Sequence, residues 1–336
     1  MSGPLTLEAR ARRRRRRTAG WTTVAGLAVL VGAALVARSW QGELPDPVAS
    51  HWGADDTADG FSSLSATLGV MLAVGSLLVL GFGAIILWFG HSALTRRVGV
   101  AAGLWSALFI ATLTIGSLNQ QRGLADARNA GGIGGVLLLA FVGSLAVAVA
   151  GAISVAGDER QPTTEPVDSG APRAAHADAG PATWTGAAAS PMAMLAGLAA
   201  AVLVFALVLL TQFWGLLVVV ILLVALIAAM SSAVVRVDSS GVTIRSSLGW
   251  PRTWVPLDEI VRADVTEVRP LRDFGGWGWR VGRKGRVGVA LRRGEALLIE
   301  RTGGRSVVVT VDDAATAAGL VNVLADRARP QPPGPR

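Results

Sequence analysis

Three aspartates and one histidine lie close together in the N-terminal part of the chain, and these side-chain types could bind a cation. Asp55, Asp56 and Asp59 match an aspartate-rich motif that chelates magnesium diphosphate in prenyl-transferring enzymes, because closely spaced carboxylates can share hard cations. His51 could add an imidazole for a metal or pH-sensing site. A second aspartate-rich motif is missing and Gly60 indicates a turn, which favours a solvated acidic loop.

Composition removes much of the remaining catalytic chemistry. The chain has no cysteine, which excludes disulfides, thiolate metal sites and cysteine nucleophiles. The sequence also contains no nucleophile with a recognisable base and no phosphate-cradling loop. We therefore predict a protein that is not an enzyme and that uses no cofactor and no metal.

The hydrophobic content predicts an integral membrane protein. Hydrophobic residues make up 51% of the chain and charged residues only 16%, which is too apolar for a soluble protein of this length. A run of roughly 20 apolar residues can cross a bilayer as a helix. The sequence predicts six such spans: Trp21 to Ala37, Ala66 to Phe89, Val98 to Leu118, Ile133 to Val155, Pro191 to Leu210, and Phe213 to Val234.

Basic residues predict the orientation of these spans. Arg10 and Arg12 through Arg17 precede the first span, and the positive-inside rule places them in the cytoplasm. Six spans return the C-terminus to the same side, and the acidic connection 38–65 is then outside. The first span resembles a signal peptide but lacks a small-x-small cleavage pattern, so we predict an uncleaved anchor in a bacterial plasma membrane. The arginines would contact anionic lipid head groups rather than nucleic acid.

The six predicted spans contain no charged residue and no histidine. Proton relays and ion-coupled carriers normally keep such groups inside the membrane, since each costs at least about 2.5 kcal/mol there. An ion-coupled transporter is therefore disfavoured, although a passive transporter or channel component needs no intramembrane charge.

Shifts in composition divide the chain into segments. Residues 157–190 are rich in Pro, Thr and Ala with mixed charge, which is typical of a disordered linker. We predict a basic cytoplasmic tail at 1–18, a four-helix membrane module at 19–156, this linker, a two-helix membrane hairpin at 191–234, a β-rich domain at 235–328 and a disordered tail at 329–336.

The β-rich domain is predicted from alternating hydrophobicity. The segments after Val234 alternate between apolar and polar residues and are separated by turn signals, which indicates short antiparallel strands. Asp312 or Asp313 offers an N-cap for a closing helix from Ala314 to Arg327. Its apolar face would carry Ala317, Leu320, Val321 and Leu324.

A basic, tryptophan-containing stretch of this domain is a candidate face for anionic lipid head groups or for another membrane protein. A solvated basic loop with its indoles packed into the domain is the alternative. The candidate residues are Trp277, Trp279, Arg280, Arg283, Lys284 and Arg286.

Two stretches resemble known families. The segments LPDPVASHW, from Leu44 to Trp52, and Ala58-Asp59-Gly60-Phe61 resemble the segment that defines a membrane family catalogued as domain of unknown function 1648 (DUF 1648). That family's pattern is Pro, an aliphatic residue, His with an aromatic residue, a glycine-containing stretch and Asp-Gly-aromatic. The usual following lysine is replaced by Ser62-Ser63.

The same segment occurs in SdpI-type immunity and signalling membrane proteins, so the resemblance implies sensing or protection rather than catalysis. The candidate outer-loop site therefore comprises Pro45, His51, Trp52, Asp55, Asp56, Asp59 and Gly60.

The last third of the chain resembles bacterial pleckstrin-homology-like (PH) domains. The resemblance rests on the strand pattern of residues 235–238, 241–244 and 255–260 together with the closing helix. Such domains often follow a two-helix membrane hairpin. The resemblance implies a small α+β fold, and no defined lipid-binding residues carry over.

These observations predict a multi-pass α-helical membrane protein with a cytoplasmic PH-like α+β domain. The function that we expect is that of a sensor, a scaffold or a regulatory or immunity-type protein. The alternatives are a facilitative transporter or channel component, and a membrane enzyme acting on a lipid-linked substrate through Asp55, Asp56 and Asp59.

Overall fold

The structure, a computed structural model, describes residues 4–174, 183–212, 214–281 and 286–329. The chain forms two compact units, residues 1–157 with 204–219 and residues 158–203 with 220–336. Five described helices are long and apolar enough to cross a membrane, which is compatible with a membrane-embedded protein. They are Ala9–Ser39, Leu64–Phe89, Ala93–Asn119, Gly134–Ser154 and Pro191–Leu210.

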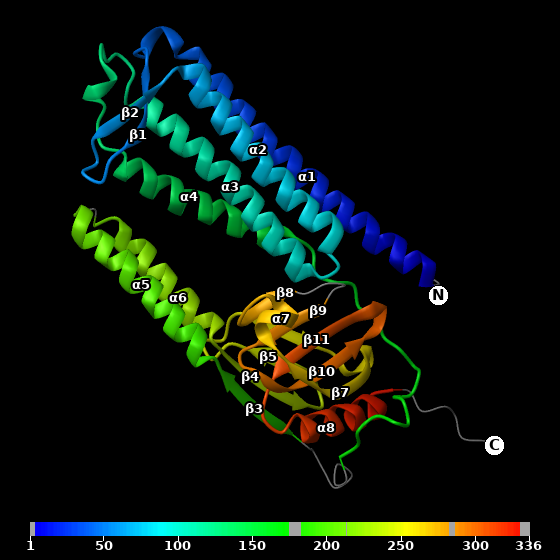
Figure 1. Ribbon diagram of the computed structural model, residues 1–336. Helices are drawn as coiled ribbons and strands as arrows, with labels where there is room; N and C mark the ends of the chain where they lie inside the picture. The colour runs from blue at the N-terminus through cyan, green and yellow to red at the C-terminus, as the bar shows by residue number, and fades with distance from the viewer. Residues whose placement is uncertain (1–3, 175–182, 213, 282–285, 330–336) are drawn as a thin grey trace, which may run out of the picture. The chain divides into compact units, whose positions relative to one another are not determined.

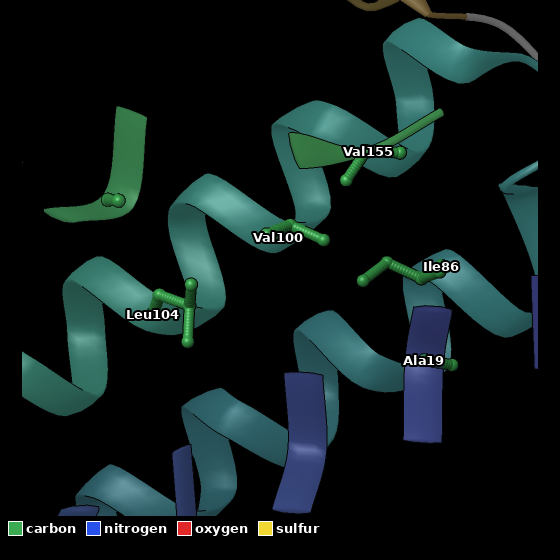
Figure 2. Packing of buried hydrophobic residues seen from close by; sticks show 6 residues of the cluster. Ala19, Ile86, Val100, Leu104 and Val155 are labelled. Carbon is green, nitrogen blue, oxygen red and sulfur yellow. The ribbon is translucent and has the colours of Figure 1, made fainter. Parts of the chain in front are cut away.

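The first unit is built on four long helices, α1 (Pro4–Ser39), α2 (Leu64–Phe89), α3 (Ala93–Asn119) and α4 (Gly134–Ser154). Helix α1 packs against α2 and α3, and α4 packs against α3 (Figure 1). Small and medium apolar side chains fill the centre. Figure 2 shows one such cluster, in which Ile86 of α2 faces Val100 and Leu104 of α3.

Glycines allow α1 and α2 to approach closely. A Cβ at Gly75 of α2 would lie 2.7 Å from Leu30 of α1, and a Cβ at Gly26 of α1 would lie 2.9 Å from Val79 of α2. A methyl group at either position would force the side chain of Leu30 or Val79, or the helix that carries it, to move. Small residues that bring helix backbones together are typical of packing in membranes, where helices gain little from apolar burial.

The outer surfaces of these helices are apolar. Leu77 of α2 and Ile153 of α4 are 72% and 73% exposed, whereas Thr22 of α1 is fully buried and donates to the carbonyl of Thr18. This arrangement reverses the usual distribution of a water-soluble bundle and suits a lipid environment.

Helix α1 begins at Pro4, so the described part of the predicted tail, residues 4–18, is helical rather than separate from the first span. The arginine run has no helix-breaking residue, and arginine is a good helix former.

The predicted sixth span is not confirmed as a span. Helix α5 (Pro191–Thr211) matches the fifth span, but α6 (Leu216–Met230) has only 15 residues. At 1.5 Å per residue α6 is about 22 Å long, shorter than a bilayer core of about 30 Å. The predicted span is shortened at its end because residues 232–234 belong to a strand.

Helices α5 and α6 nevertheless form a hairpin, so that α6 ends close to where α5 begins. The N–H of Ser190, just before α5, donates to the carbonyl of Ser231, just after α6, at 2.8 Å. Along the pair, a Cβ at Gly197 would lie 2.6 Å from Ile227. The start of α5 and the end of α6 therefore lie together.

Two sheets form the β-rich part of the second unit. One has the order β3-β4-β5-β6 and the other the order β7-β10-β11-β9-β8. The strands are β3 (Trp184–Ala189), β4 (Ser232–Asp238), β5 (Gly241–Arg245), β6 (Arg252–Val255), β7 (Ile260–Val268), β8 (Gly278–Val281), β9 (Arg286–Ala290), β10 (Gly294–Arg301) and β11 (Arg305–Thr310).

The strand pattern differs from the prediction in one pair. Strands β9 and β11 run parallel, with Val287 opposite Val307, whereas the other pairs are antiparallel as predicted. Alternating hydrophobicity locates strands but is the same for both directions. A short helix, α7 (Pro270–Phe274), connects β7 to β8.

The closing helix α8 spans Ala314–Arg327, as predicted, and contacts β7 and β10. Asp313 occupies the N-cap position but its side chain makes no capping hydrogen bond. The four residues of the predicted apolar face, Ala317, Leu320, Val321 and Leu324, are buried.

The prediction of a disordered linker at 157–190 is wrong at residues 184–189, which form strand β3. Strand β3 pairs along β4, and the segment 158–174 is bound to the β-rich part of its unit. Backbone N–H groups of this segment donate to carboxylates and a carbonyl: Gln161 to Glu259 at 2.9 Å, Thr163 to Asp258 at 2.7 Å and Val167 to Asp326 at 2.8 Å. Residues 175–182 of the linker, and 330–336 of the predicted disordered tail, lie outside the described residues.

Glu259 is the centre of this attachment. Glu259 is only 1% exposed, and its carboxylate forms ion pairs with Arg301 and Arg305. Burial, followed by the neighbouring Arg301, lowers the pKa of Arg305. The segment is therefore held by hydrogen bonds to charged side chains of the domain, which a composition rule does not detect.

Replacing Asp326 by alanine should release the segment 158–174. The variant loses the acceptor for Val167 and the ion pair with Arg173, so proteases should cleave this segment several-fold faster than in the parent. Asp312→Ala, which removes an exposed carboxylate paired with Arg292, is the matched control. Equal cleavage of the two variants would contradict the attachment.

Candidate functional site

The candidate outer-loop residues lie in a small folded structure at one end of the four-helix unit. Strands β1 (Val48–Trp52) and β2 (Ala58–Ser62) form an antiparallel hairpin. The hairpin contacts the short helix η2 (Ala127–Asn129), which lies between α3 and α4. We call the whole hairpin, residues 48–62, together with the connections 40–47 and 120–133, the cap.

Val48 and Gln121 fix the hairpin to the helices. Val48 is fully buried against Ala37, Leu68 and Leu118. Gln121, also fully buried, accepts from the N–H of Ala49 at 2.7 Å and donates to its carbonyl at 3.0 Å. The amide thus takes the place of a neighbouring strand for β1.

Asp56 connects the hairpin to α4. Its carboxylate accepts from the N–H of Ile133 at 2.8 Å and from the N–H of Gly134 at 3.2 Å, at the start of α4. The N-cap residue of α4, Ile133, has no side chain that can cap. Asp56 therefore supplies the N-terminal capping group of α4 from another part of the chain. Its negative charge is also favourable at the positive end of the helix dipole.

Asp55 stabilises the turn of the hairpin. Its carboxylate accepts from the hydroxyl of Thr57 at 2.8 Å and from the N–H of Thr57 at 3.3 Å. The hydrogen bonds from Thr57 lower the pKa of the Asp55 carboxyl below its usual value. Both hydrogen bonds of this side chain stabilise the turn, and the next residue, Asp56, has a positive φ of 61°, a conformation that aspartate tolerates.

His51 and Asp59 form the solvent-facing pair of the hairpin. Nδ1 of His51 lies 2.5 Å from Oδ1 of Asp59, and the two side chains are 71% and 52% exposed. Gly60 lies opposite His51, where a Cβ would be 2.7 Å from the Cβ of His51. Glycine at this position leaves the space that the imidazole needs to reach Asp59.

Trp52 and Pro45 complete the set of candidate residues. The indole of Trp52 is partly exposed and donates to the carbonyl of Gly131 at 3.0 Å. Pro45 is buried in the connection before β1. Trp52 thus joins the hairpin to the connection before α4, and neither side chain presents a reactive group.

The cap contains further polar residues that the sequence did not single out. Arg122 forms an ion pair with Glu43 at 2.7 Å and lies 4.7 Å from the ring of Trp40. The carbonyl of Glu43 accepts from the N–H of Gly123 at 2.7 Å. These contacts, like those of Gln121, join segments more than 70 residues apart, so no local motif marks them.

The aspartate motif does not gather into a cation site. Asp55 faces Thr57, Asp56 faces α4 and Asp59 faces His51. Among the described residues, no group of three or more metal-ligating side chains could hold a metal ion. The close spacing in sequence is used for a turn, a helix cap and a cross-strand pair.

The opposite end of the four-helix unit is basic. Arg96 is buried and donates to the carbonyls of Gly90 and Ala156, and Arg97 donates to the carbonyl of Val155. These carbonyls include the end of α4, where positive charge is favourable. Arg15 contacts His91 at 3.0 Å, and burial, followed by the charge of Arg15, lowers the pKa of His91.

The predicted basic face of the β-rich domain is described only in part, because Arg283 and Lys284 lie outside the described residues. Trp277 and Trp279 are partly exposed, and Arg280 donates to the carbonyl of Trp277. Arg286 is exposed at the start of β9. A Cβ at Gly278 would lie 3.2 Å from the carbonyl of Met230, so this face begins beside the end of α6.

Comparison of the chain with protein-family models, with curated proteins and with solved structures finds no match. The resemblances to DUF 1648 and to PH-like domains therefore remain predictions.

Replacing Gln121 by leucine should destabilise the cap. Leucine has a similar volume but leaves the N–H and the carbonyl of Ala49 without their buried partner, at a cost of about 1–3 kcal/mol for an unsatisfied group. Thermal unfolding in detergent measures the loss. Gln41→Leu, at an exposed position of the cap, should unfold like the parent, and an unchanged Gln121→Leu would disprove the clamp.

Proposed function

We propose that the chain is a non-catalytic, membrane-embedded sensor or regulator that communicates the state of the cap to the β-rich domain through α4. The observation that carries this proposal is the bond between the Asp56 carboxylate and the start of α4. The contacts of Asp55 with Thr57 and of Asp56 with α4 support a structural role for these two aspartates over a catalytic one.

The route is continuous in the chain. Asp56 holds the first residues of α4, and Arg96 and Arg97 hold the carbonyls at its other end. The chain then enters the segment 158–174, which is bound to the domain through Glu259 and Asp326. A movement of the hairpin that shifts α4 along its axis would therefore pull on this segment.

The exposed pair His51–Asp59 is the part of the cap that a ligand or partner can reach. Both side chains are more than half exposed, while Asp55 and Asp56 are engaged with the protein. The resemblance to SdpI-type proteins at these residues supports sensing or protection as the role.

Asp56→Ala tests the route in the full chain reconstituted into lipid nanodiscs. Loss of the Asp56 hydrogen bonds to the start of α4 should speed hydrogen exchange at residues 133–137 and also at residues 158–174, by several-fold. Asp46→Ala, an exposed carboxylate of the same cap, is the control and should change neither segment. Faster exchange confined to 133–137 would show local capping only and would refute the sensor proposal.

We also propose that both termini and the β-rich domain are cytoplasmic. The nine arginines at 10, 12–17, 96 and 97 lie at the end of the unit opposite the acidic cap. Because the start of α5 and the end of α6 lie together, the chain would enter and leave this helix pair on one side of the membrane, so the proposed orientation does not require α6 to be a full span.

Cysteine labelling tests this orientation, since the chain has no cysteine of its own. In intact cells a membrane-impermeant maleimide should label Ser50→Cys, on the exposed surface of β1, and should not label Ser240→Cys between β4 and β5. Permeabilised cells provide the control, in which both variants are labelled. The reverse pattern would place the domain outside.

A further inference from the structure

The turn between β5 and β6, residues 246–251, exposes two large apolar side chains. Leu248 is 65% exposed and Trp250 is 69% exposed. The backbone beneath them is well ordered by hydrogen bonds: the N–H of Ser246 donates to the carbonyl of Pro251, and the N–H of Gly249 to the carbonyl of Ser246, both at 2.9 Å. We call residues 246–251 the tip.

The tip lies directly beside the end of the helix pair. Strand β4 begins at Ser232, two residues after the last residue of α6, and pairs with β5 so that Val234 is opposite Arg245. The next contact along this pair is a hydrogen bond between the hydroxyls of Ser232 and Ser247. The residue after Ser247 is Leu248, so its side chain is exposed at the level where α6 ends.

Two arginines flank the tip on one face of the sheet. Arg245 and Arg252 are directly opposite each other on β5 and β6, and both are exposed. Like charges in this position repel and destabilise a strand pair. Neither guanidinium has an ion-pair partner among the described residues, so the sheet itself does not compensate for the repulsion.

We propose that the tip inserts into the interfacial layer of the leaflet where α5 begins and α6 ends, and that Arg245 and Arg252 contact phosphate groups of anionic lipids. The proposal rests on α5 and α6 lying in the membrane. Tryptophan prefers this layer because its ring is apolar while its N–H can donate to head groups. Anionic phosphates relieve the repulsion between the two arginines.

We choose a bilayer as the partner of the tip because the fold of the chain places the tip beside the membrane helices. The hydrogen bond between Ser190 and Ser231 holds the start of α5 next to the end of α6, and the tip is joined to the same place through Ser232. The tip thus needs no other molecule to reach lipid. A protein partner would have to compete with head groups already at this level.

The test is the membrane depth of a nitroxide attached to Leu248→Cys in the full chain, reconstituted into nanodiscs of neutral lipid or of neutral lipid with anionic phosphatidylglycerol. In anionic nanodiscs the label should collide more with oxygen and less with a water-soluble nickel complex than the same label at Ser240→Cys. Ser240 is exposed at the other end of β5 and serves as the matched control.

The lipid dependence tests the role of the arginines. We combine Arg245→Gln and Arg252→Gln with Leu248→Cys. In anionic nanodiscs, the ratio of molecules with the tip in the membrane to molecules with the tip in water should fall by about fivefold for each arginine removed. In neutral nanodiscs this ratio should not change. High salt should have the same effect on the parent.

Three results would overturn the proposal. A label at Leu248 as accessible to the nickel complex as the label at Ser240 would show that the tip stays in water. Protection from both nickel and oxygen would show a protein contact instead of lipid. Insertion that is equal in neutral and anionic nanodiscs, and unchanged by the arginine substitutions, would show that Arg245 and Arg252 do not bind the phosphates of anionic lipids.

Discussion

Helix α4 depends on other parts of the chain for hydrogen-bond partners of the backbone groups at both its ends. It contains no charged residue, and its flanking residues Ile133 and Val155 offer no side-chain caps. Asp56 brings a negative charge to its N-terminal amides, and Arg97 brings a positive charge to its C-terminal carbonyls. In an apolar surrounding unsatisfied backbone groups are costly, so the cap, the start of α3 and α4 stabilise one another.

The long apolar segments were predictable because lipid imposes a simple rule on them. A run of apolar residues must be helical there, and α5 begins at Pro191 and α2 ends at Phe89, where the sequence places them. The limits of α6 were not predictable, since Val234 is apolar and suits a strand as well as a span. Pairing with β5, a contact between segments, decides in favour of the strand.

The candidate site was predictable in its location but not in its use. A cluster of aspartates in a polar connection suggests a cation site. Spacing in the sequence, however, does not show in which direction each side chain points. Asp56 turns away from Asp55 and Asp59 because its partner, Gly134, is brought near by folding of the helices. Gln121 carried no signal at all, since a buried amide that clamps a strand looks like any polar residue at a helix end.

The pairing of β3 with β4 has a consequence for biosynthesis. These neighbouring strands are separated in the chain by α5 and α6, so the helical pair is an excursion from within one sheet. When β3 leaves the ribosome its partner has not been made, and its edge stays open until both helices have been translated. The sheet can therefore close only after both helices have been synthesised, which places translation of α5 and α6 ahead of the completion of this sheet.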